Sequence, residues 1–546
     1  APAADMAEPA AQAADLVPND RNHLSDVFVR DLQSGANTLV SANAENSRSG
    51  NGISLNPAIS ANGLRVAFVS FADNLAAQPA GVTDGNQVED VFVRDLPTGT
   101  TRLLSLDATG LASGNGASTA PSISADGRLA AFQSRATNLV ANDANKLADV
   151  FVRDLSSDTT TLASVNAAGT GSGNGASELP ALSPDARWVV FQSRATDLVD
   201  PPVAAGGLGI YARDLSTQTI RRLLHGAFDS AAAARGPVIS ADGRWVAVNW
   251  ILSTIYLHDL RTGQNSNLCS NCRNPALSAD GRYVAHERLE PGGKTDVYVE
   301  DMTTGNGTLV SVNQSGTSGG NANSTAPVIS GDGRYVVFKS KAIDLVANDT
   351  NGWADVFVRD MVGGTTLLVS ANLQTTASAN FLSSEPFLGA DGRTVSFASF
   401  ASDLVAGDFN NTKDVFVLRL GSGDSDGDGL PDDWEVTYFN DLAHDGSTDS
   451  DGDGASDAAE YNAGTNPTKD ASVLRALTVT SAGTEQTTVL WLAVPGKTYR
   501  VQSKDDLNAA NWTDLPGEVT ASGDQGSAVD PGGAKSQRYY RVRLVP

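Results

Sequence analysis

One phrase of seven residues returns along most of the chain. It is clearest as Asp-Val-Phe-Val-Arg-Asp-Leu at residues 149–155, and degenerate copies of it lie between residues 26 and 420. The copies begin at Asp26, Asp90, Asp149, Gly209, Thr254, Asp296, Asp355 and Asp414. A regular internal repeat is typical of architectures in which each unit buries its apolar side chains against its neighbours. This repeat constrains the fold more strongly than any other feature of the chain.

A second phrase alternates with the first. It is clearest at residues 120–132, and its other copies begin near Asn56, Leu179, Gly236, Asn274, Ala326 and Glu385, which makes seven. Each copy places Asp-Gly, or a variant of it, between two apolar runs. This is a strong hairpin signal, because a type I′ turn needs positive φ at both central residues. We therefore expect seven type I′ hairpins, of which the one at Asp185 and Ala186 lacks the glycine and must use another turn or be strained.

Together the two phrases define a unit of four strands, a to d. Strand a is Pro-x-Ile-Ser, strand b is Arg-x-Val-x-Phe, strand c is the Asp-Val-Phe phrase, and strand d is Thr-x-Leu-Val-Ser. Strand c is apolar on both faces, which indicates a sheet that is covered on both sides. Blades stacked around an axis give this double cover. The sequence therefore predicts a mainly β chain with a seven-bladed β-propeller.

The two phrases resemble the WD40-like (PD40) repeats of TolB-type β-propellers. The resemblance covers roughly residues 14–421. It implies the fold with more force than the function, because that family includes peptide-binding, scaffolding and catalytic members.

The ends of the array supply one c strand too many. Residues 14–20 match residues 343–349, so the chain begins inside a loop between strands b and c and then supplies c and d. The last unit adds strands a and b and its own strand c at residues 414–420, which gives eight c strands for seven a–b pairs. We expect residues 38–41 to complete the seventh blade as its outer strand, beside this last c strand. The N-terminal c strand would then be displaced, or would take the place itself.

Five loops between strands b and c share the pattern Asp-x-Asn-x-x-x-Asp. Oxygen atoms at positions 1, 3 and 7 could line a calcium site, and the alternative is an Asx turn, in which these side chains bond their own backbone. The residues are Asp20, Asn22, Asp26, Asp84, Asn86, Asp90, Asp143, Asn145, Asp149, Asp349, Asn351, Asp355, Asp408, Asn410 and Asp414.

The units between residues 206 and 291 depart from the repeat. Unusual residues gather there, namely Trp245, Trp250, His225, His258, His286, Cys269 and Cys272. A specific surface of a repeat protein is expected where the repeat is broken, and the alternative is drift with these side chains packed in the core. Some TolB-like propellers are polysaccharide lyases that hold a metal with histidines, but no spacing here indicates a shared metal.

Cys269 and Cys272 are the only cysteines of the chain. A redox pair of the thioredoxin type needs a βαβ setting, which the sequence does not show, and a zinc site needs two further ligands. We expect a local disulfide that stiffens one loop.

Two acidic segments follow the propeller. Residues 424–435 and 449–460 both fit the twelve-residue EF-hand loop, with oxygen ligands at positions 1, 3, 5, 9 and 12, a carbonyl ligand at 7 and glycine at 6. The predicted Ca²⁺ ligands are Asp424, Asp426, Asp428, Leu430, Asp432, Glu435, Asp449, Asp451, Asp453, Ala455, Asp457 and Glu460. A short helix is expected after each loop, and a disordered acidic linker is the alternative.

This pattern is similar to the thrombospondin type 3 and dockerin-like calcium repeats of exported bacterial proteins, which implies a structural ion. Strand patterns return near the C-terminus and suggest a small antiparallel sandwich similar to fibronectin or immunoglobulin modules. We therefore divide the chain into a leader (1–13), the propeller (14–421), the paired calcium loops (422–471) and the β-sandwich (472–546).

Charge and composition exclude some classes of function. The net charge is −25, so the chain would repel the phosphates of nucleic acids. It contains no apolar run long enough to span a membrane. The chain starts at Ala1 without a methionine or a leader, which we interpret as an exported protein after signal removal, with a trimmed chain as the alternative.

Three functions remain. The first is a non-catalytic, calcium-stabilised binding protein, secreted or at the cell surface, whose propeller contacts an extracellular polysaccharide or protein. The second is a polysaccharide lyase or hydrolase, although the sequence contains no nucleophile motif and predicts no catalytic residue. The third is a self-assembling surface or filament subunit that pairs strands between chains. The Arg-Asp ending of strand c recurs with the fold, and we expect it to form structural ion pairs.

Overall fold

The computed structural model describes residues 16–545 except 33, 77–81, 83, 144, 204–206, 227–235, 251–253, 411, 421–429, 440–443, 445, 464, 470–473, 475, 483–485, 495–496, 507–510, 522, 524 and 533–536. The chain divides into two compact units, residues 1–419 and 420–546. Each unit is described separately below.

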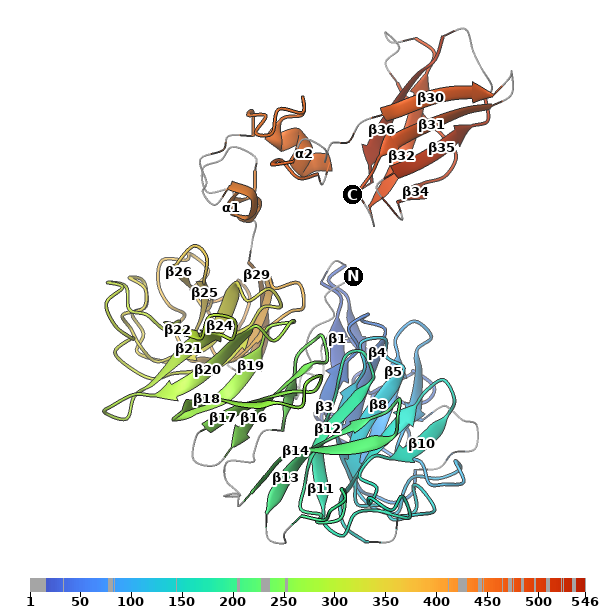
Figure 1. Ribbon diagram of the computed structural model, residues 1–546, viewed down its shortest axis with the longest axis vertical. Helices are drawn as coiled ribbons and strands as arrows, with labels where there is room; N and C mark the ends of the chain where they lie inside the picture. Colours follow the sequence, from blue (N-terminus) through green and yellow to red (C-terminus); the bar gives the residue numbers. More distant parts are fainter. Residues whose placement is uncertain are drawn as a thin grey trace. The chain divides into compact units, whose positions relative to one another are not determined.

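The first unit is a succession of antiparallel sheets whose strands follow the order of the chain (Figure 1). A two-stranded sheet, β1 (Phe28–Arg30) and β2 (Asn37–Leu39), comes first. Six four-stranded sheets follow: β3 (Ser54–Ile59), β4 (Arg65–Ser70), β5 (Asp90–Asp95) and β6 (Thr100–Leu103); β7 (Ser118–Ile123), β8 (Leu129–Ser134), β9 (Asp149–Asp154) and β10 (Thr159–Leu162); β11 (Ser177–Leu182), β12 (Trp188–Ser193), β13 (Leu208–Asp214) and β14 (Thr219–Gly226); β15 (Val238–Ile239), β16 (Trp245–Trp250), β17 (Thr254–Asp259) and β18 (Asn265–Ser270); β19 (Cys272–Leu277), β20 (Tyr283–Leu289), β21 (Thr295–Asp301) and β22 (Asn306–Leu309); β23 (Ser324–Ile329), β24 (Tyr335–Ser340), β25 (Asp355–Asp360) and β26 (Thr365–Leu368). A three-stranded sheet ends the series: β27 (Ser383–Leu388), β28 (Thr394–Ser399) and β29 (Asp414–Arg419).

Neighbouring sheets bury their side chains against one another. Val69 and Val91 of the sheet β3–β6 share one core with Phe132 and Phe151 of the sheet β7–β10. Similar cores join the following sheets as far as β23–β26. In six of the sheets the aromatic ring of strand b stacks on that of strand c, as Phe132 does on Phe151 with ring centroids 6.0 Å apart; the sheet β15–β18 has Val248 at this place instead. The mainly β propeller architecture and the double cover of strand c are therefore confirmed.

The a–b hairpins differ from the expected turn. In the hairpin between β7 and β8, the Gly127 amide donates to the Ser124 carbonyl at 2.9 Å, and Gly127 alone has positive φ, at 70°. A type I′ turn would need two such residues, so the predicted turn type is wrong. The longer turn places one residue in the left-handed region, and the aspartate before it accepts a hydrogen bond from the Arg128 amide. Ala186 adopts the same turn with φ of 61°, so this hairpin keeps the turn and is strained.

The expected closure of the array is also not observed. Residue Thr38 pairs with Val29 of β1, and among the described residues β29 pairs with β28 alone. The reason is local: the Ser41 hydroxyl donates to the buried Asp26 carboxylate at 2.5 Å. In later units the equivalent serine after strand d donates in the same way to the first aspartate of strand c. Val27 and Val40 pack with the sheet β3–β6. The N-terminal c and d strands therefore form their own hairpin beside the first four-stranded sheet.

The second unit begins with two short helices, α1 (Asp432–Phe439) and α2 (Asp457–Ala463), which confirms the expected helix after each acidic loop. The strands that follow are β30 (Ala476–Ala482), β31 (Gln486–Leu492), β32 (Thr498–Lys504), β33 (Thr513–Asp514), β34 (Val519–Thr520), β35 (Gln525–Asp530) and β36 (Tyr539–Leu544). They form two antiparallel sheets, one of β30, β31 and β35 and one of β32, β33, β34 and β36. Trp491 of β31 and Tyr499 of β32 lie in one shared core. The relation to immunoglobulin modules remains a prediction.

Candidate functional site

The second acidic loop gathers its predicted ligands. Carboxylate oxygens of Asp449, Asp451 and Asp453 lie within 4.8 Å of one another. The loop holds them in place with its own backbone: the amides of Gly452 and Gly454 donate to the two Asp449 oxygens at 2.8 and 3.0 Å. One oxygen each of Asp451 and Asp453 is buried without a hydrogen-bond donor. Such a concentration of inward-facing oxygen is the ligand set that a hard cation requires.

Glu460, at position 12 of this loop, lies on α2 and is fully buried. Burial, and then the charges of Asp451 and Asp453, raise the pKa of its carboxyl to about 7. The Thr465 hydroxyl donates to Oε1 at 3.2 Å, and Oε2 has no donor. A divalent cation would remove the repulsion that these carboxylates experience together, so the donor set fits Ca²⁺.

Position 9, Asp457, is fully buried as well. Its Oδ1 accepts from the Ser450 amide at 3.1 Å, and its Oδ2 accepts from the hydroxyls of Ser450 and Thr448. Position 7 contributes only its backbone, as expected for Ala455.

The first acidic loop is described in part. Asp424, Asp426 and Asp428 lie outside the described residues, as does the side chain of Asp432. Leu430 and Glu435 are fully buried, and Glu435 lies on α1. Position 12 is therefore placed as in the second loop, buried on the helix, whereas position 7 is more deeply buried than Ala455.

The loops between strands b and c use their asparagines in Asx turns. The Asn145 side-chain oxygen accepts from the Leu147 amide at 2.7 Å, while its Nδ2 donates to Asp149 Oδ2 at 2.7 Å and to the Gly173 carbonyl at 2.8 Å. Asn22, Asn86, Asn351 and Asn410 make the same Asx turn. Asp149 also accepts from the Ser164 hydroxyl at 2.6 Å. The asparagine and the last aspartate of the pattern thus have protein partners.

The first aspartate of the pattern is held less well. Asp143 and Asp349 are each 5% exposed, and neither carboxylate accepts a hydrogen bond of full geometry; the Ser172 hydroxyl and the Asn145 amide lie near Asp143, and the Ser378 hydroxyl and the Asn351 amide lie near Asp349. Burial is the main cause that raises the pKa of Asp143, and burial together with the Asp143 charge raises the pKa of Asp149 to about 7. The same two causes raise the pKa of Asp355 to about 7, with Asp349 as the neighbour. These pairs suit a shared cation or a shared proton, so the calcium prediction for these loops stays open.

The pattern varies among the remaining loops. Burial is also the main cause that raises the pKa of Asp26 to about 6 and of Asp90 to about 8. Asp20 is 5% exposed, whereas Asp84 and Asp408 are half-buried.

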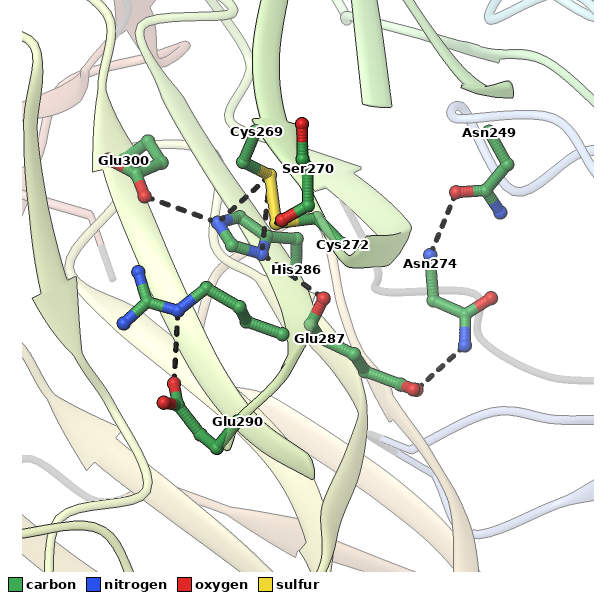
Figure 2. Close-up of a disulfide and its surroundings, with 10 residues drawn as sticks. Asn249, Cys269, Ser270, Cys272, Asn274, His286, Glu287, Glu290 and Glu300 are labelled. Atoms are coloured by element: carbon green, nitrogen blue, oxygen red, sulfur yellow. Dashed lines mark hydrogen bonds and ion pairs between the residues drawn. A yellow bond between two sulfur atoms is a disulfide. The ribbon is translucent and has the colours of Figure 1, made fainter. Parts of the chain in front are cut away.

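The two histidines singled out in the sequence have separate partners. His258 on β17 is buried, and its Nδ1 lies 2.6 Å from Asn265 Oδ1. Burial lowers its pKa. His286 on β20 lies instead beside a disulfide between Cys269 and Cys272 and close to Glu300, as Figure 2 shows. The side chains of His225 and Trp250 lie outside the described residues.

Sequence reasoning missed an exposed aromatic cluster, which we define as Trp353, Phe381 and Phe400. The ring centroids of Trp353 and Phe381 are 4.7 Å apart, and those of Phe381 and Phe400 are 6.2 Å apart. The three residues are 45, 38 and 40% exposed. They come from the loop before β25, the loop before β27 and the end of β28, which all lie at the same edge of the antiparallel sheets.

An alignment of the repeat units would have revealed this cluster. The position of Phe381, two residues before strand a, is Gly52, Gly116 or Gly175 in the first three four-stranded sheets. There a Cβ would lie 2.6 to 2.8 Å from the backbone that follows strand b, so glycine is needed. At Phe381 the hydrogen bond from the Phe400 amide to the Leu382 carbonyl is 3.2 Å, against 2.9 Å from Phe71 to Ile53. The phenyl ring of Phe381 is thus accompanied by a longer backbone hydrogen bond between the end of strand b and the start of strand a.

The family model that matches this chain is the bacterial TSP3 repeat, a repeat of the calcium-binding type, at residues 424–440 and 449–469. No curated protein matches the chain. No described helix has both the length and the apolar character needed to cross a membrane.

Solved structures resemble the propeller. TolB from Acinetobacter baumannii is 19% identical, with 62% of this chain and 74% of that chain covered and a TM-score of 0.30. An oligogalacturonate lyase from Vibrio parahaemolyticus is 12% identical, with 72% and 96% covered and a TM-score of 0.40. The propeller domain of the Trilobed protease from Pyrococcus furiosus is 13% identical, with 68% and 95% covered and a TM-score of 0.37. The chain is therefore similar to these proteins in its fold alone.

Proposed function

We propose that this chain is an exported, calcium-stabilised and non-catalytic binding protein, and that the aromatic cluster on its propeller contacts an extracellular polysaccharide. The observation that carries the proposal is the exposure of Trp353, Phe381 and Phe400 on one rim. Large apolar side chains that lie together in water are costly unless a partner covers them. Aromatic rings are common at binding surfaces, because they offer a large contact area at little conformational cost.

The surroundings of the cluster favour a sugar over a purely apolar partner. The Asn380 amide nitrogen donates to the Ser402 hydroxyl at 3.0 Å, and the Asn380 backbone amide donates to Asp403 at 2.9 Å. These exposed polar groups lie next to the rings in the sequence and can exchange hydrogen bonds with hydroxyl groups. The net charge of −25 disfavours polyanions, so we expect a neutral polysaccharide.

Calcium has a structural role in this proposal. The TSP3-type loops follow the last propeller strand, and their carboxylates repel one another until a cation binds. Extracellular calcium is in the millimolar range, which fills even weak loops of this kind. Binding of an ion would hold the carboxylates of Asp449, Asp451, Asp453 and Glu460 together.

The proposal is tested by sedimenting the calcium-loaded protein with insoluble polysaccharides and cell-surface extracts, and by assaying the same tubes for new reducing or unsaturated ends. Phe381→Gly restores the residue of the first three sheets, and Trp353→Leu restores the residue at the same place before β9. Each variant should reduce binding at least about 10-fold, because each removes one stacking surface. Phe71→Ala is the matched control: Phe71 follows strand b as Phe400 does and is 44% exposed, but it lies outside the cluster.

Each result has a distinct meaning. Binding that is lost in Phe381→Gly and kept in Phe71→Ala supports the proposal. Binding of an extract protein, with no polysaccharide retained, would assign the cluster to a protein partner. Product formation would overturn the non-catalytic function and favour the lyase or hydrolase.

A second candidate function is self-assembly, and β29 favours it. Val415, Val417 and Leu418 on this strand are 53, 44 and 40% exposed. Among the described residues no strand pairs with the outer edge of β29, and an apolar edge strand of this kind can pair with another chain. A mass that grows with protein concentration, and that Val417→Lys abolishes, would support this function.

A further inference from the structure

Three departures from the repeat meet at one point of the propeller. His286 on β20 occupies the place of a buried apolar residue in strand b, which is Phe68, Phe132, Phe191, Val248, Phe338 or Phe397 in the other sheets. Glu300 on β21 occupies a place in strand c that holds Arg94, Arg153, Arg213 or Arg359 elsewhere. The only two cysteines of the chain lie at the end of β18 and the start of β19.

The sheet pairing brings these side chains together (Figure 2). Cys269 Sγ lies 3.9 Å from Nε2 and 4.0 Å from Nδ1 of His286, and Nε2 lies 3.4 Å from Glu300 Oε1. Ligand atoms of Cys269, Cys272 and His286 all lie within 4.8 Å of one another. His286 and Cys272 have no exposed surface. The four groups therefore converge in a site that is largely closed to water.

The separations fit a tetrahedral metal site. With the usual zinc bond lengths, nitrogen and oxygen ligands are about 3.4 Å apart and sulfur and nitrogen ligands about 3.6 Å apart. His286 Nδ1 lies 3.3 Å from the Glu287 carbonyl oxygen. A hydrogen bond from Nδ1 to that carbonyl would leave Nε2 free as the ligand, which is the usual outer contact of a metal-binding histidine.

Gly307 leaves room for the Glu300 carboxylate. It lies opposite Glu300 in the register of β21 and β22. A Cβ at this position would lie 2.6 Å from both carboxylate oxygens of Glu300. Gly307 thus leaves free the space that the Glu300 carboxylate, the fourth ligand, occupies.

We propose that Cys269, Cys272, His286 and Glu300 form a binding site for a thiophilic divalent ion of the zinc type, which becomes available when the disulfide is reduced. A dithiol reductant supplies two electrons and two protons, the sulfur–sulfur bond breaks, and two thiols form while the reductant becomes a disulfide. The metal ion then displaces both thiol protons and binds two thiolates, the His286 imidazole and the Glu300 carboxylate. The disulfide and the metal complex exclude each other, because both use the same sulfur atoms.

Cobalt(II) is the probe, since it occupies zinc sites and absorbs light when thiolates bind it. The full chain is loaded with calcium to fill the acidic loops, reduced with dithiothreitol, freed of reductant without oxygen and titrated with Co²⁺. Thiols are counted on a parallel sample after denaturation. We expect one cobalt per chain with a thiolate-to-cobalt charge-transfer band in the reduced protein, and no such band in the oxidised protein.

Variants that restore the repeat separate ligation from folding. His286→Phe introduces the residue of most other sheets and keeps both thiols, and it should weaken cobalt binding at least about 10-fold, as should Glu300→Gln. His258→Arg is the matched control, because it also replaces a buried histidine by the usual residue of its strand position. It should leave the titration unchanged. Near-ultraviolet circular dichroism reports whether each variant is folded.

Two results would overturn the proposal. One is a reduced, folded protein with two free thiols that shows no thiolate-to-cobalt band. The other is a band that persists with unchanged affinity in folded His286→Phe, which would mean that the thiols bind the ion without the histidine. If the first result comes with visible absorption that is equal in oxidised and reduced protein, the ion is assigned to the acidic loops.

Discussion

Arg282, the residue before β20, donates two hydrogen bonds to Asp301, the last residue of β21: Nε to Oδ1 at 3.2 Å and Nη2 to Oδ2 at 2.9 Å. The same contact between the start of strand b and the end of strand c recurs in the other four-stranded sheets as Arg65–Asp95, Arg128–Asp154, Arg187–Asp214, Arg244–Asp259 and Arg334–Asp360. The aspartate that ends strand c therefore forms a structural ion pair, as its repetition predicts, but its partner is the arginine at the start of strand b and not the arginine that precedes it in strand c.

These ion pairs make the propeller sensitive to acid. Arg282 lowers the pKa of Asp301 from 3.8 to about 2. A carboxyl group with a lowered pKa stabilises the fold above its unfolded pKa and loses that contribution as the pH falls towards the folded value. We predict that Arg282→Gln melts below the wild type at pH 6, and that the difference shrinks towards zero between pH 4 and pH 2. A constant difference over this range would show that the pair does not contribute through charge.

Calcium binding should depend on Glu460. We predict that Glu460→Gln weakens one calcium site at least about 10-fold, because the twelfth position supplies two oxygens to an EF-hand loop. In calcium-free buffer the same variant should be more stable than the wild type, because it removes a charge that Asp451 and Asp453 repel. Isothermal titration and thermal unfolding with a chelator measure the two effects. Glu178→Gln, on β11 of the other unit, should change neither.

The strained hairpin offers a stabilising substitution. Ala186 has φ of 61° where the six other hairpins carry a glycine with positive φ, namely Gly63, Gly127, Gly243, Gly281, Gly333 and Gly392. An alanine in this region costs about 1–2 kcal/mol, part of which the larger chain entropy of an unfolded glycine offsets. We predict that Ala186→Gly stabilises the protein by up to about 1 kcal/mol in denaturant unfolding. Gly127→Ala should destabilise it by a similar amount, and equal stability of both variants would contradict the strain.

The buried Asp143 tests whether the b–c loops take an ion. Its carboxylate accepts no hydrogen bond of full geometry and burial raises its pKa, so Asp143→Asn should stabilise the calcium-free protein by roughly 1–3 kcal/mol. If calcium binds between Asp143 and Asp149, the same variant should reduce the rise in melting temperature that calcium produces. A calcium effect that is unchanged in the variant would confine the ion to the TSP3-type loops.

The strands were predictable because each unit repeats the same local rules. Asp149 to Asp154 is apolar on both faces and becomes a strand buried on both faces, and Gly127 marks a turn. The turn type was not predictable from Asp126-Gly127 alone, because the loop length decides which residue takes positive φ. The acidic loops could be located from the sequence, since the oxygen-bearing residues of each loop lie within twelve positions; which of these residues bind an ion stays a prediction.

The convergence of Cys269, His286 and Glu300 could not be predicted from the sequence. These residues lie on β18, β20 and β21, so their distances depend on the register of two sheets and on how the sheets pack. The prediction of how the array closes was wrong for a related reason. Residues 38–41 carry the pattern of an outer strand, but the Asp26–Ser41 hydrogen bond keeps them with their own neighbour.

The hairpin β1–β2 also bears on how such chains change in length. Because the hairpin packs on the sheet β3–β6, that sheet has a neighbour on each side, as the sheets that follow it have. Removing or duplicating residues 118–176, one full unit, would leave both kinds of contact intact at the junction. An array of this kind can therefore gain or lose whole units in evolution. The hairpin β1–β2 and the acidic segment would be kept at its two ends.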